Sequence, residues 1–339
     1  MMAISRIAQA CSWACPQIQV IVRDNSGDAQ KRDVIGRFQR DHCTIVSSEP
    51  CDGTTNFAEG LRLATGEFVF AIADDDLYFD RAITGLPAII DAHSNDPRVV
   101  GMTGAYSIET SSGSALVEYQ NIGSDEVTSR VAGYLTARAA SVLFYSPHRR
   151  AMVQRIFDFT CSLPAYFSFH DQIICLIYLL HGKYIAMPRI IYGYDIGPWQ
   201  TREGSDQQDT AFYTRAGLDP AINKLHWFIC GFEGAVLARN SDLFPDPGPR
   251  RRQAIADQWF AVMFARFLQS PRYTADSPYT AQAEAVCQKL RASQGQLSFE
   301  GMLADIAGLM GVFAPDLAQR YFQFWSAAMN RRQPAAASA

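Results

Sequence analysis

The sequence lacks several features that would place it in a specialised class. It has no run of about 18 apolar residues, the length that a helix needs to cross a bilayer. Its 30 Lys and Arg residues against 34 Asp and Glu give a net charge of -4, so no basic surface for nucleic acid is expected. The opening stretch, "MMAISRIAQACSWACP", has no apolar core of the kind found in signal peptides. These absences predict a globular, cytoplasmic protein.

The cysteine spacing excludes the common redox and zinc motifs. Of the eight cysteines, Cys11 and Cys15 are the only close pair, and they do not form a C-x-x-C motif. Most of the eight fall within apolar segments, which favours reduced thiols in the core. The chain has no internal repeat, and its 339 residues are enough for one large core or two moderate ones.

The first part of the chain alternates between helical and strand-like segments. Apolar residues at helical spacing occur in "SRIAQACSWAC", "AQKRDVIGRFQR" and "TNFAEGLRLAT", while "QIQVIVRD", "CTIVSSE" and "EFVFAIA" are rich in strand-forming residues. The strand-like runs are apolar throughout, which favours a parallel sheet covered on both faces. Ligands of such sheets bind beyond the carboxyl ends of the strands, where "DNSGD" and "ADDD" stand in this sequence.

The later part of the chain is mostly helical. The segment "GPWQTREGSDQQDT" is rich in Gly, Gln and Asp and predicts a loop, and five helical segments follow, from "AINKLHWFICGFEGAVLARN" to "PDLAQRYFQFWSAAMN". The predicted organisation is an α/β domain at residues 1–200, a helical region at 201–333 and a disordered tail at 334–339.

Three consecutive aspartates, Asp74, Asp75 and Asp76, directly follow an apolar strand. Like charges about 4 Å apart repel each other by roughly 1 to 4 kcal/mol per pair, depending on the effective dielectric constant. Such a group after a buried strand therefore favours a bound cation. The alternative is a solvated acidic turn that caps the next helix.

Three stretches together resemble the consecutive blocks of family 2 GT-A glycosyltransferases, within the nucleotide-diphospho-sugar transferase superfamily. They are "IQVIVRDNSGD", "GTTNFAEGLRLATGEFVFAIADDDLYFD" and "HDQIICLIYLLHGKYIAMPRIIYGYD", in the family's order, and the resemblance covers roughly residues 5–197. The resemblance implies a Rossmann-like parallel or mixed sheet with helices on both faces, followed by an α-helical C-terminal region. It also implies a metal-dependent, inverting transferase of the hexosyltransferase type, which moves a sugar from a nucleotide-diphospho-sugar to an acceptor hydroxyl.

The resemblance assigns the nucleotide side of the site to the ends of the first two strands. Asp24 matches the acid that recognises the base, and Asn25 and Ser26 shape the loop below it. The segment "CDGTTN" matches the loop under the nucleotide-sugar, where Gly53 would permit close approach of the backbone and Asn56 would contact the donor. The alternatives are an Asx-turn at Asn25 and a helix cap in the second loop.

The acidic triple matches the family's D-x-D type motif, which implies a divalent metal, Mn²⁺ or Mg²⁺, that bridges the donor diphosphate. The alignment is ambiguous by one residue. We place the metal on Asp76 and Asp74, with Asp74 also facing the donor and Asp75 as the competing ligand. Hard carboxylate oxygens suit these ions. As a turn residue, Asp76 is expected to be exposed and of little consequence for stability.

Asp171 matches the acid that removes a proton from the acceptor hydroxyl. It begins the helix "HDQIICLIYLLHG", where the helix dipole helps to keep a carboxylate ionised, and a plain helix N-cap is the alternative. His170 stands where relatives carry another acid, and it is a candidate to tune Asp171 or to contact the acceptor. Trp199, Arg202 and Glu203 are candidates for a lid over the donor and acceptor.

One departure from the family leaves two functions open. Relatives begin with a strand that ends in a "P-T-Y-N-R"-like turn, and no such strand precedes "SRIAQACSWAC". The first function is a transferase of bacterial surface polysaccharide or glycoconjugate synthesis, acting on a glycan or lipid-linked acceptor in the cytoplasm or at the inner face of the membrane. The second is a truncated or degenerate, non-catalytic relative that binds a nucleotide or a partner. A sheet without its opening strand would expose backbone groups, which favours pairing with another chain, including a second copy in a homodimer. A sugar nucleotidyltransferase fits less well, because its Gly-rich phosphate loop is not visible.

Overall fold

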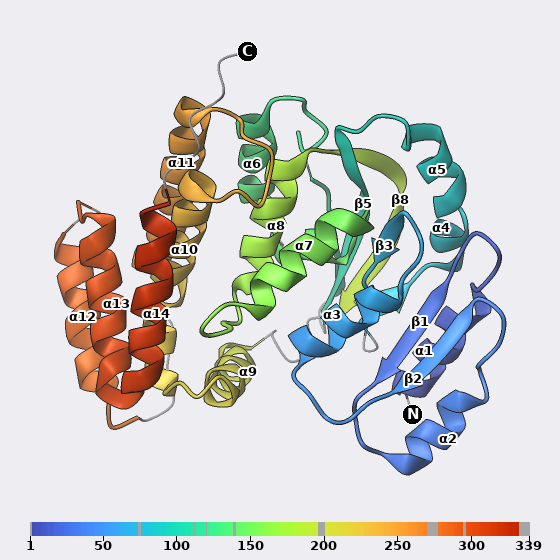
Figure 1. Cartoon of the computed structure of the whole chain (residues 1–339), viewed down its shortest axis with the longest axis horizontal. Coiled ribbons are helices and arrows are strands. Elements are labelled where there is room, and N and C mark those ends of the chain that lie inside the picture. The colour runs from blue at the N-terminus through green and yellow to red at the C-terminus, as the bar shows by residue number, and fades with distance from the viewer. Residues whose placement is uncertain are drawn as a thin grey trace. The chain divides into compact units, whose positions relative to one another are not determined.

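The computed structural model describes residues 2–73, 76–110, 113–119, 121–137, 140–195, 201–269, 277–293 and 296–331. The chain forms two compact units (Figure 1), each made of separate stretches of sequence. Unit 1 comprises Met1–Asp125, Ala137–Ser162 and His181–Asp195, and unit 2 comprises Glu126–Thr136, Leu163–Leu180 and Ile196–Ala339. These units therefore do not coincide with a division at residue 200. The predicted tail at 334–339 lies outside the described residues.

Unit 1 contains the predicted alternation of strands and helices. Its helices are α1 (Met2–Ser12), α2 (Ala29–Gly36), α3 (Gly53–Leu63), α4 (Asp80–Thr84), α5 (Leu86–His93) and α7 (Arg150–Cys161), with a 3-10 helix at Ala140–Tyr145. Its strands are β1 (Val20–Asp24), β2 (Cys43–Ser47), β3 (Phe68–Phe70), β4 (Leu77–Tyr78), β5 (Val99–Thr110), β6 (Gly113–Val117), β7 (Pro147–Arg149) and β8 (Lys183–Asp195). α4 and α5 are separated at Gly85, because Pro87 cannot continue the helix that precedes it.

The described strands form two sheets, and the larger one is mixed instead of parallel. β1 and β2 are a parallel pair in which Asp24 lies opposite Ser47. The other six strands have the order β3-β7-β5-β8-β4, with β6 paired to β5, and β5–β8 is the one parallel pair among the described pairs of this sheet. The ring of Phe70 in β3 nevertheless lies 5.9 Å from that of Tyr78 in β4, at the other end of the strand order. The sheet is therefore curled.

The parallel arrangement expected from the apolar runs holds for β1 and β2 but is wrong for the larger sheet, whose mixed arrangement agrees with the parallel or mixed sheet that the resemblance implied. Continuous apolar runs report that a strand is buried on both faces, and they carry no information about its direction. The direction is set by the connections. Only two residues of sequence separate β5 from β6, which leaves no room for the crossover that a parallel pair needs, and the two strands are antiparallel.

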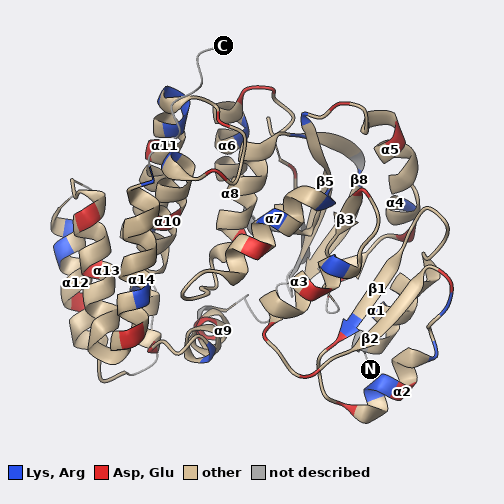
Figure 2. Ribbon diagram, viewed as in Figure 1, with Lys and Arg blue, Asp and Glu red and all other residues tan. Residues whose placement is uncertain are grey.

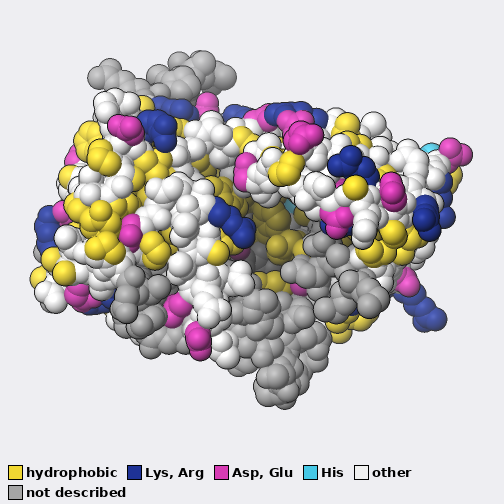
Figure 3. Space-filling view, turned by 90° about the horizontal axis from the view of Figure 1, so that it is seen from below, with side chains coloured by type: hydrophobic (Ala, Val, Ile, Leu, Met, Phe, Trp, Pro, Cys, Tyr) yellow, Lys and Arg dark blue, Asp and Glu magenta, His cyan; other side chains and the backbone are white. Residues whose placement is uncertain are grey.

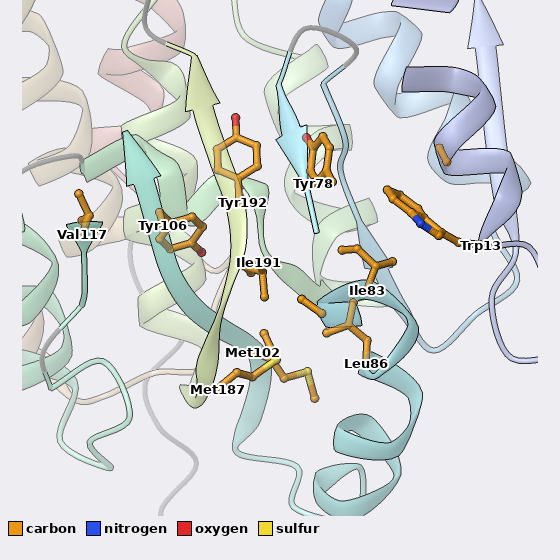
Figure 4. Close-up of a cluster of buried hydrophobic side chains, with 12 residues drawn as sticks. Trp13, Tyr78, Ile83, Leu86, Met102, Tyr106, Val117, Met187, Ile191 and Tyr192 are labelled. Atoms are coloured by element: carbon orange, nitrogen blue, oxygen red, sulfur yellow. The ribbon is translucent and has the colours of Figure 1, made fainter. Parts of the chain in front are cut away.

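The main core of unit 1 packs between the curled sheet and α4 (Figure 4). Its buried members include Met102, Tyr106 and Ile191 from the strands and Ile83 from α4. At the edge of this core, α1 covers β4. The side chain of Gln9 donates a hydrogen bond of 3.2 Å to the backbone carbonyl of Tyr78, and both Gln9 and Trp13 donate to Asp80 Oδ1 at 2.8 Å. These contacts fix β4 and the residue before it, Asp76.

Unit 2 is helical in its described residues. Its helices are α6 (Val127–Thr136), α8 (His170–His181), α9 (Arg202–Arg215), α10 (His226–Asn240), α11 (Pro249–Gln269), α12 (Thr280–Ala292), α13 (Phe299–Phe313) and α14 (Pro315–Met329), with a 3-10 helix at Pro220–Leu225. α10 and α11 lie side by side because Gly234 leaves room for the buried Trp259, whose Nε1 would lie 2.2 Å from a Cβ at that position. The five helical segments predicted after residue 220 are confirmed.

The loop predicted at "GPWQTREGSDQQDT" is wrong from residue 202 onward, where α9 begins. The hydroxyl of Thr201 accepts a hydrogen bond of 3.0 Å from the Gly204 amide, and Glu203 places an acid in the first turn. Both features stabilise a helix N-terminus. The Gly, Gln and Asp content of the segment concealed this capping pattern.

The surface has no strong separation of charge among the described residues. Lys and Arg are interspersed with Asp and Glu along the helices of both units (Figure 2), in keeping with the net charge of -4. Hydrophobic side chains gather over the C-terminal helices at the left of Figure 3. Val312 in α13 and Phe322 in α14 are 48% and 44% exposed. Within the described ranges, no helix is both long and apolar enough to span a membrane.

We expect the free energy of unfolding to fall as the pH drops below about 6.5, in part because of His148. Its imidazole is buried, with Nδ1 2.9 Å from the Tyr184 hydroxyl, and burial lowers the pKa of His148 to about 3. The unfolded chain takes up a proton near pH 6.5 that the folded chain does not accept until about pH 3. The contribution to stability is therefore complete above pH 6.5 and is lost at about 1.4 kcal/mol per pH unit as the pH falls.

Urea unfolding of the wild type and of His148→Gln at pH 7 and pH 5 measures this effect. The wild type should lose about 2 kcal/mol more than the variant between the two pH values. Equal losses in the two proteins would contradict the assignment to His148.

Candidate functional site

The predicted nucleotide-side residues lie together at the carboxyl ends of β1 and β2. Asp24 is the last residue of β1, and Asn25 Nδ2 donates a hydrogen bond of 2.8 Å to the carbonyl of Cys51, in the loop after β2. One hydrogen bond therefore joins the two loops that the resemblance assigned to the nucleotide. The alternative of a simple Asx-turn at Asn25 does not describe this contact, because its partner is 26 residues away in the sequence.

Asp24 is a buried carboxylate with two polar partners. Its Oδ1 lies 3.0 Å from Lys31 Nζ, and its Oδ2 accepts a hydrogen bond of 3.1 Å from the Ser26 hydroxyl. Burial acts to raise the pKa of Asp24, but the hydrogen bonds from Lys31 and Ser26 and the charge of Lys31 outweigh it and lower the pKa below its usual value. Asp24 is therefore ionised at neutral pH and suited to accept a hydrogen bond from a ligand.

The side chains of Asp52 and Asn56 hold the second loop and the start of α3 in place. The N-cap of α3 is Asp52, whose carboxylate accepts hydrogen bonds from the Thr55 amide at 2.9 Å and the Thr55 hydroxyl at 2.6 Å. Asn56 does not cap the helix. Its Oδ1 accepts a hydrogen bond of 2.8 Å from Arg23 Nη1, which ties α3 to β1. Gly53 begins α3, and no described atom lies within 4 Å of where its Cβ would be.

Asp76 lies between β3 and β4 and is 2% exposed, so the expectation of an exposed turn residue is wrong for it. The buried phenol of Tyr192, in β8, donates a short hydrogen bond to Asp76 Oδ2. Burial, followed by the neighbouring tyrosines and the Asp76 carboxylate, raises the pKa of Tyr192, which keeps this donor protonated. Figure 4 shows the hydroxyls of Tyr192 and Tyr78 pointing toward the same end of the sheet, and Tyr78 accepts a hydrogen bond of 2.7 Å from the Ala73 amide.

Two of the three predicted acids of this turn, Asp74 and Asp75, lie outside the described residues. Within the described part of the chain, no group of three or more His, Cys, Asp and Glu side chains could hold a metal ion. As a single ligand, Asp76 fits the chemistry of Mg²⁺ or Mn²⁺. Its carboxylate is a hard oxygen donor, and the hydrogen bond from Tyr192 keeps it in one orientation. These ions usually take one or two protein carboxylates and complete their shell with water and phosphate oxygens.

Asp171 is the second residue of α8, and its Oδ1 accepts a hydrogen bond of 2.7 Å from the Gln172 amide. His170 precedes it and is buried, with Nδ1 accepting a hydrogen bond of 2.9 Å from the Phe167 amide. Both residues belong to unit 2, whereas Asp24 and Asp76 belong to unit 1. His170 is only 1% exposed, so its side chain contacts other protein groups and not solvent.

The lid candidates are only partly described. Trp199 lies outside the described residues, as does the side chain of Arg202. Glu203 is exposed in the first turn of α9, where its carboxylate accepts a hydrogen bond of 3.5 Å from Gln207. Glu203 is therefore part of a helix, whereas the sequence predicted that it lies in a loop.

Sequence reasoning missed the partners of the predicted acids. Lys31 of α2 and Tyr192 of β8 lie in segments already singled out in the sequence, but neither residue was assigned to the site. A basic residue seven positions after Asp24, across a turn, is a local signal that could have been used. No local signal links Tyr192 to Asp76, because 116 residues separate them.

Comparison with solved structures identifies proteins that have a similar fold. No family model matches the chain, and no curated protein matches its sequence. The structure of TarS 1-349 from S. aureus in complex with UDP-GlcNAc is similar, with a TM-score of 0.50 and 15% identity over 96% of this chain and 84% of that one. The same TarS fragment in complex with UDP gives a TM-score of 0.47 at 15% identity, over 96% and 83% of the two chains. The expected α/β fold of the glycosyltransferase type, followed by a helical C-terminal region, is confirmed.

Proposed function

We propose that this chain is a glycosyltransferase of family 2 that uses a nucleotide-diphospho-sugar donor, a divalent metal and an inverting displacement. The observation that carries the proposal is the pair of buried carboxylates, Asp24 and Asp76, that follow β1 and β3 in unit 1 of a fold shared with a UDP-GlcNAc complex. An ionised carboxylate in a buried position costs free energy, so a site of this kind favours ligand binding over a purely structural role.

The donor side of the proposed site uses unit 1. Asp24 accepts a hydrogen bond from the base, and the amides at the start of α3, beside Gly53, approach the diphosphate. Asp76, together with Asp74 or Asp75, would hold Mn²⁺ or Mg²⁺. When bound, the metal draws negative charge from the departing diphosphate. Tyr192 keeps the Asp76 carboxylate in a fixed orientation through its hydrogen bond.

The acceptor side uses Asp171 as general base. It takes the proton of the acceptor hydroxyl while the hydroxyl oxygen attacks the anomeric carbon from the side opposite the diphosphate, and this displacement inverts the anomeric configuration. The N-terminus of α8 supports an ionised carboxylate at this position. We propose a glycan or lipid-linked acceptor of bacterial surface polysaccharide synthesis, encountered in the cytoplasm or at the inner membrane face. We also propose that two copies of the chain form a homodimer.

A second candidate function is a nucleotide-binding protein without transfer activity. It is favoured by the fact that both buried carboxylates of unit 1 already have partners, Lys31 at Asp24 and Tyr192 at Asp76. In that case these pairs would be structural, and nucleotide would bind without the metal.

Thermal unfolding with a panel of nucleoside diphosphates and nucleotide-sugars, each with and without Mn²⁺, tests the proposal. A ligand specific for the folded state stabilises it by about 2.7 kcal/mol at a hundred times its Kd. We expect one nucleotide to raise Tm more in the presence of Mn²⁺ than in its absence. A panel that leaves Tm unchanged under both conditions would contradict both candidate functions.

A further inference from the structure

Three buried polar side chains in unit 2 form a connected group beside Asp171. They are His170 at the start of α8, Glu233 in the middle of α10 and Tyr321 in α14, and none is more than 1% exposed. The two helices α10 and α14 lie beyond residue 197, where the sequence resemblance ends. The group therefore joins the start of α8 to the helical C-terminal region.

The direction of each hydrogen bond in the group is fixed. His170 Nδ1 accepts from the Phe167 amide at 2.9 Å, so the ring proton is on Nε2, which donates to Glu233 Oε2 at 2.8 Å. The other carboxylate oxygen, Oε1, accepts from the Tyr321 hydroxyl at 2.7 Å. Burial, and then the Glu233 charge, raise the pKa of Tyr321, which keeps the hydroxyl protonated. In each of these three hydrogen bonds, only one of the two partners can be the donor. The Glu233 carboxylate accepts one hydrogen bond at each of its two oxygens.

A buried carboxylate is a costly way to hold helices together. Well-packed apolar side chains of similar volume stabilise a core as well or better, because no charge has to leave water. What the carboxylate adds is a defined geometry, since the hydrogen bonds fix both the rotation of the imidazole and the position of the residue that carries it. The Phe167 ring packs in the same place, 5.5 Å from His170 and 6.2 Å from Tyr321.

The residue whose position this group determines is Asp171. His170 binds the backbone of the turn that leads into α8, and Asp171 follows it directly. A shift of the turn would carry the Asp171 carboxylate with it. An error of about 1 Å in the placement of a reacting group can cost on the order of 100-fold in rate.

We propose that Glu233 and Tyr321 are positioning residues for Asp171 and act through His170, so that the C-terminal helices take part in the transfer step. This inference rests on the proposed role of Asp171 as general base.

The test uses the full chain and the mildest variant, Tyr321→Phe, which removes one hydroxyl and keeps the ring. We expect kcat to fall about tenfold with an unchanged KM for the donor, since the donor residues are in unit 1. Hydrogen exchange of the backbone amides at 167–173 should also become faster. The matched control is Tyr134→Phe in α6, which removes the same atom from an equally buried tyrosine of unit 2.

A second variant separates positioning from general stability. In His170→Asn, the side-chain oxygen can still accept from the Phe167 amide, but the side chain is too short to reach Glu233. In this background, Tyr321→Phe should have no further effect on kcat. Two results would overturn the inference. One is an equal loss of kcat in Tyr134→Phe, and the other is a loss of kcat in the double variant that equals the combined losses of His170→Asn and Tyr321→Phe.

The hydrogen-exchange measurement distinguishes failure of the inference from failure of the proposed function. If the wild type transfers sugar but Tyr321→Phe retains its kcat and its exchange rates, the inference is overturned and the proposed function stands. If the wild type transfers no sugar from any donor, the proposed function fails. The role of Glu233 and Tyr321 in sugar transfer then fails as well. This holds even if hydrogen exchange of the amides at 167–173 shows that Glu233 and Tyr321 stabilise the start of α8.

Discussion

Asp171→Asn is expected to lower kcat by between about 10²- and 10⁴-fold and to leave the affinity for the nucleotide-sugar unchanged. An acceptor hydroxyl is a poor nucleophile until its proton is removed, and asparagine cannot accept that proton. The donor residues Asp24 and Asp76 lie in the other unit, so donor binding does not need Asp171. Single-turnover rates and calorimetric titration of the donor measure the two quantities separately.

The control for Asp171→Asn is Asp257→Asn, which makes the same change at an exposed position of α11 in the same unit. Because Asp171 also accepts a hydrogen bond from the Gln172 amide, the variant should lose some stability, and asparagine retains most of this capping ability. Transfer at a near wild-type rate by Asp171→Asn would contradict the role of general base. A variant that fails to fold would assign Asp171 to the helix cap.

Asp76→Asn is expected to remove the effect of Mn²⁺ on nucleotide binding. In the wild type, the metal should tighten binding of the nucleoside diphosphate by at least about tenfold, because it neutralises charge on both the carboxylate and the diphosphate. Asparagine can still accept the hydrogen bond from Tyr192, but it brings no negative charge to a metal. Isothermal titration with UDP and with the nucleotide that performs best in the thermal panel, each with and without Mn²⁺, measures the loss.

The stability of Asp76→Asn should also fall, by about 1 to 3 kcal/mol, because the side chain is buried and the bond from Tyr192 loses its charged acceptor. Asp80→Asn is the matched control. Asp80 lies four residues further on and accepts hydrogen bonds from Gln9 and Trp13, so its variant tests local stability without a metal ligand. Metal-dependent binding that survives in Asp76→Asn would move the metal to Asp74 or Asp75, and its survival in all three variants would remove the acidic turn from the site.

The helices of this protein could be predicted from sequence because their signal is local. Apolar residues recur at helical spacing in α1, α3 and α14, and each was placed within a few residues of its observed bounds. α9 was missed because its composition resembles that of a loop, although Thr201 provides an ordinary helix cap. Strand direction and the curl of the large sheet could not be predicted, since they depend on pairings between distant segments.

The sequence indicated which acids stand near the ends of strands, but it did not indicate the side chains that hold them. Strand ends bring Asp24 and the loop at Cys51 together, as expected from their positions after β1 and β2. The partners that fix the acids come from far along the chain, with Tyr192 contacting Asp76 and Glu233 contacting His170. Such pairs are set by tertiary packing, which leaves no pattern in a single sequence.

The most direct test of the central claim is to follow the anomeric proton of the nucleotide-sugar by NMR in the presence of the protein and Mg²⁺. The nucleotide-sugar is the one that stabilises the protein best in the thermal panel, and the acceptors are water, simple glycosides and a lipid-linked glycan extract. A transferase should consume the donor over many turnovers, release one nucleoside diphosphate per sugar and give a product of the opposite anomeric configuration. A donor that binds but remains intact with every acceptor would contradict the account and identify the chain as a non-catalytic nucleotide-binding relative.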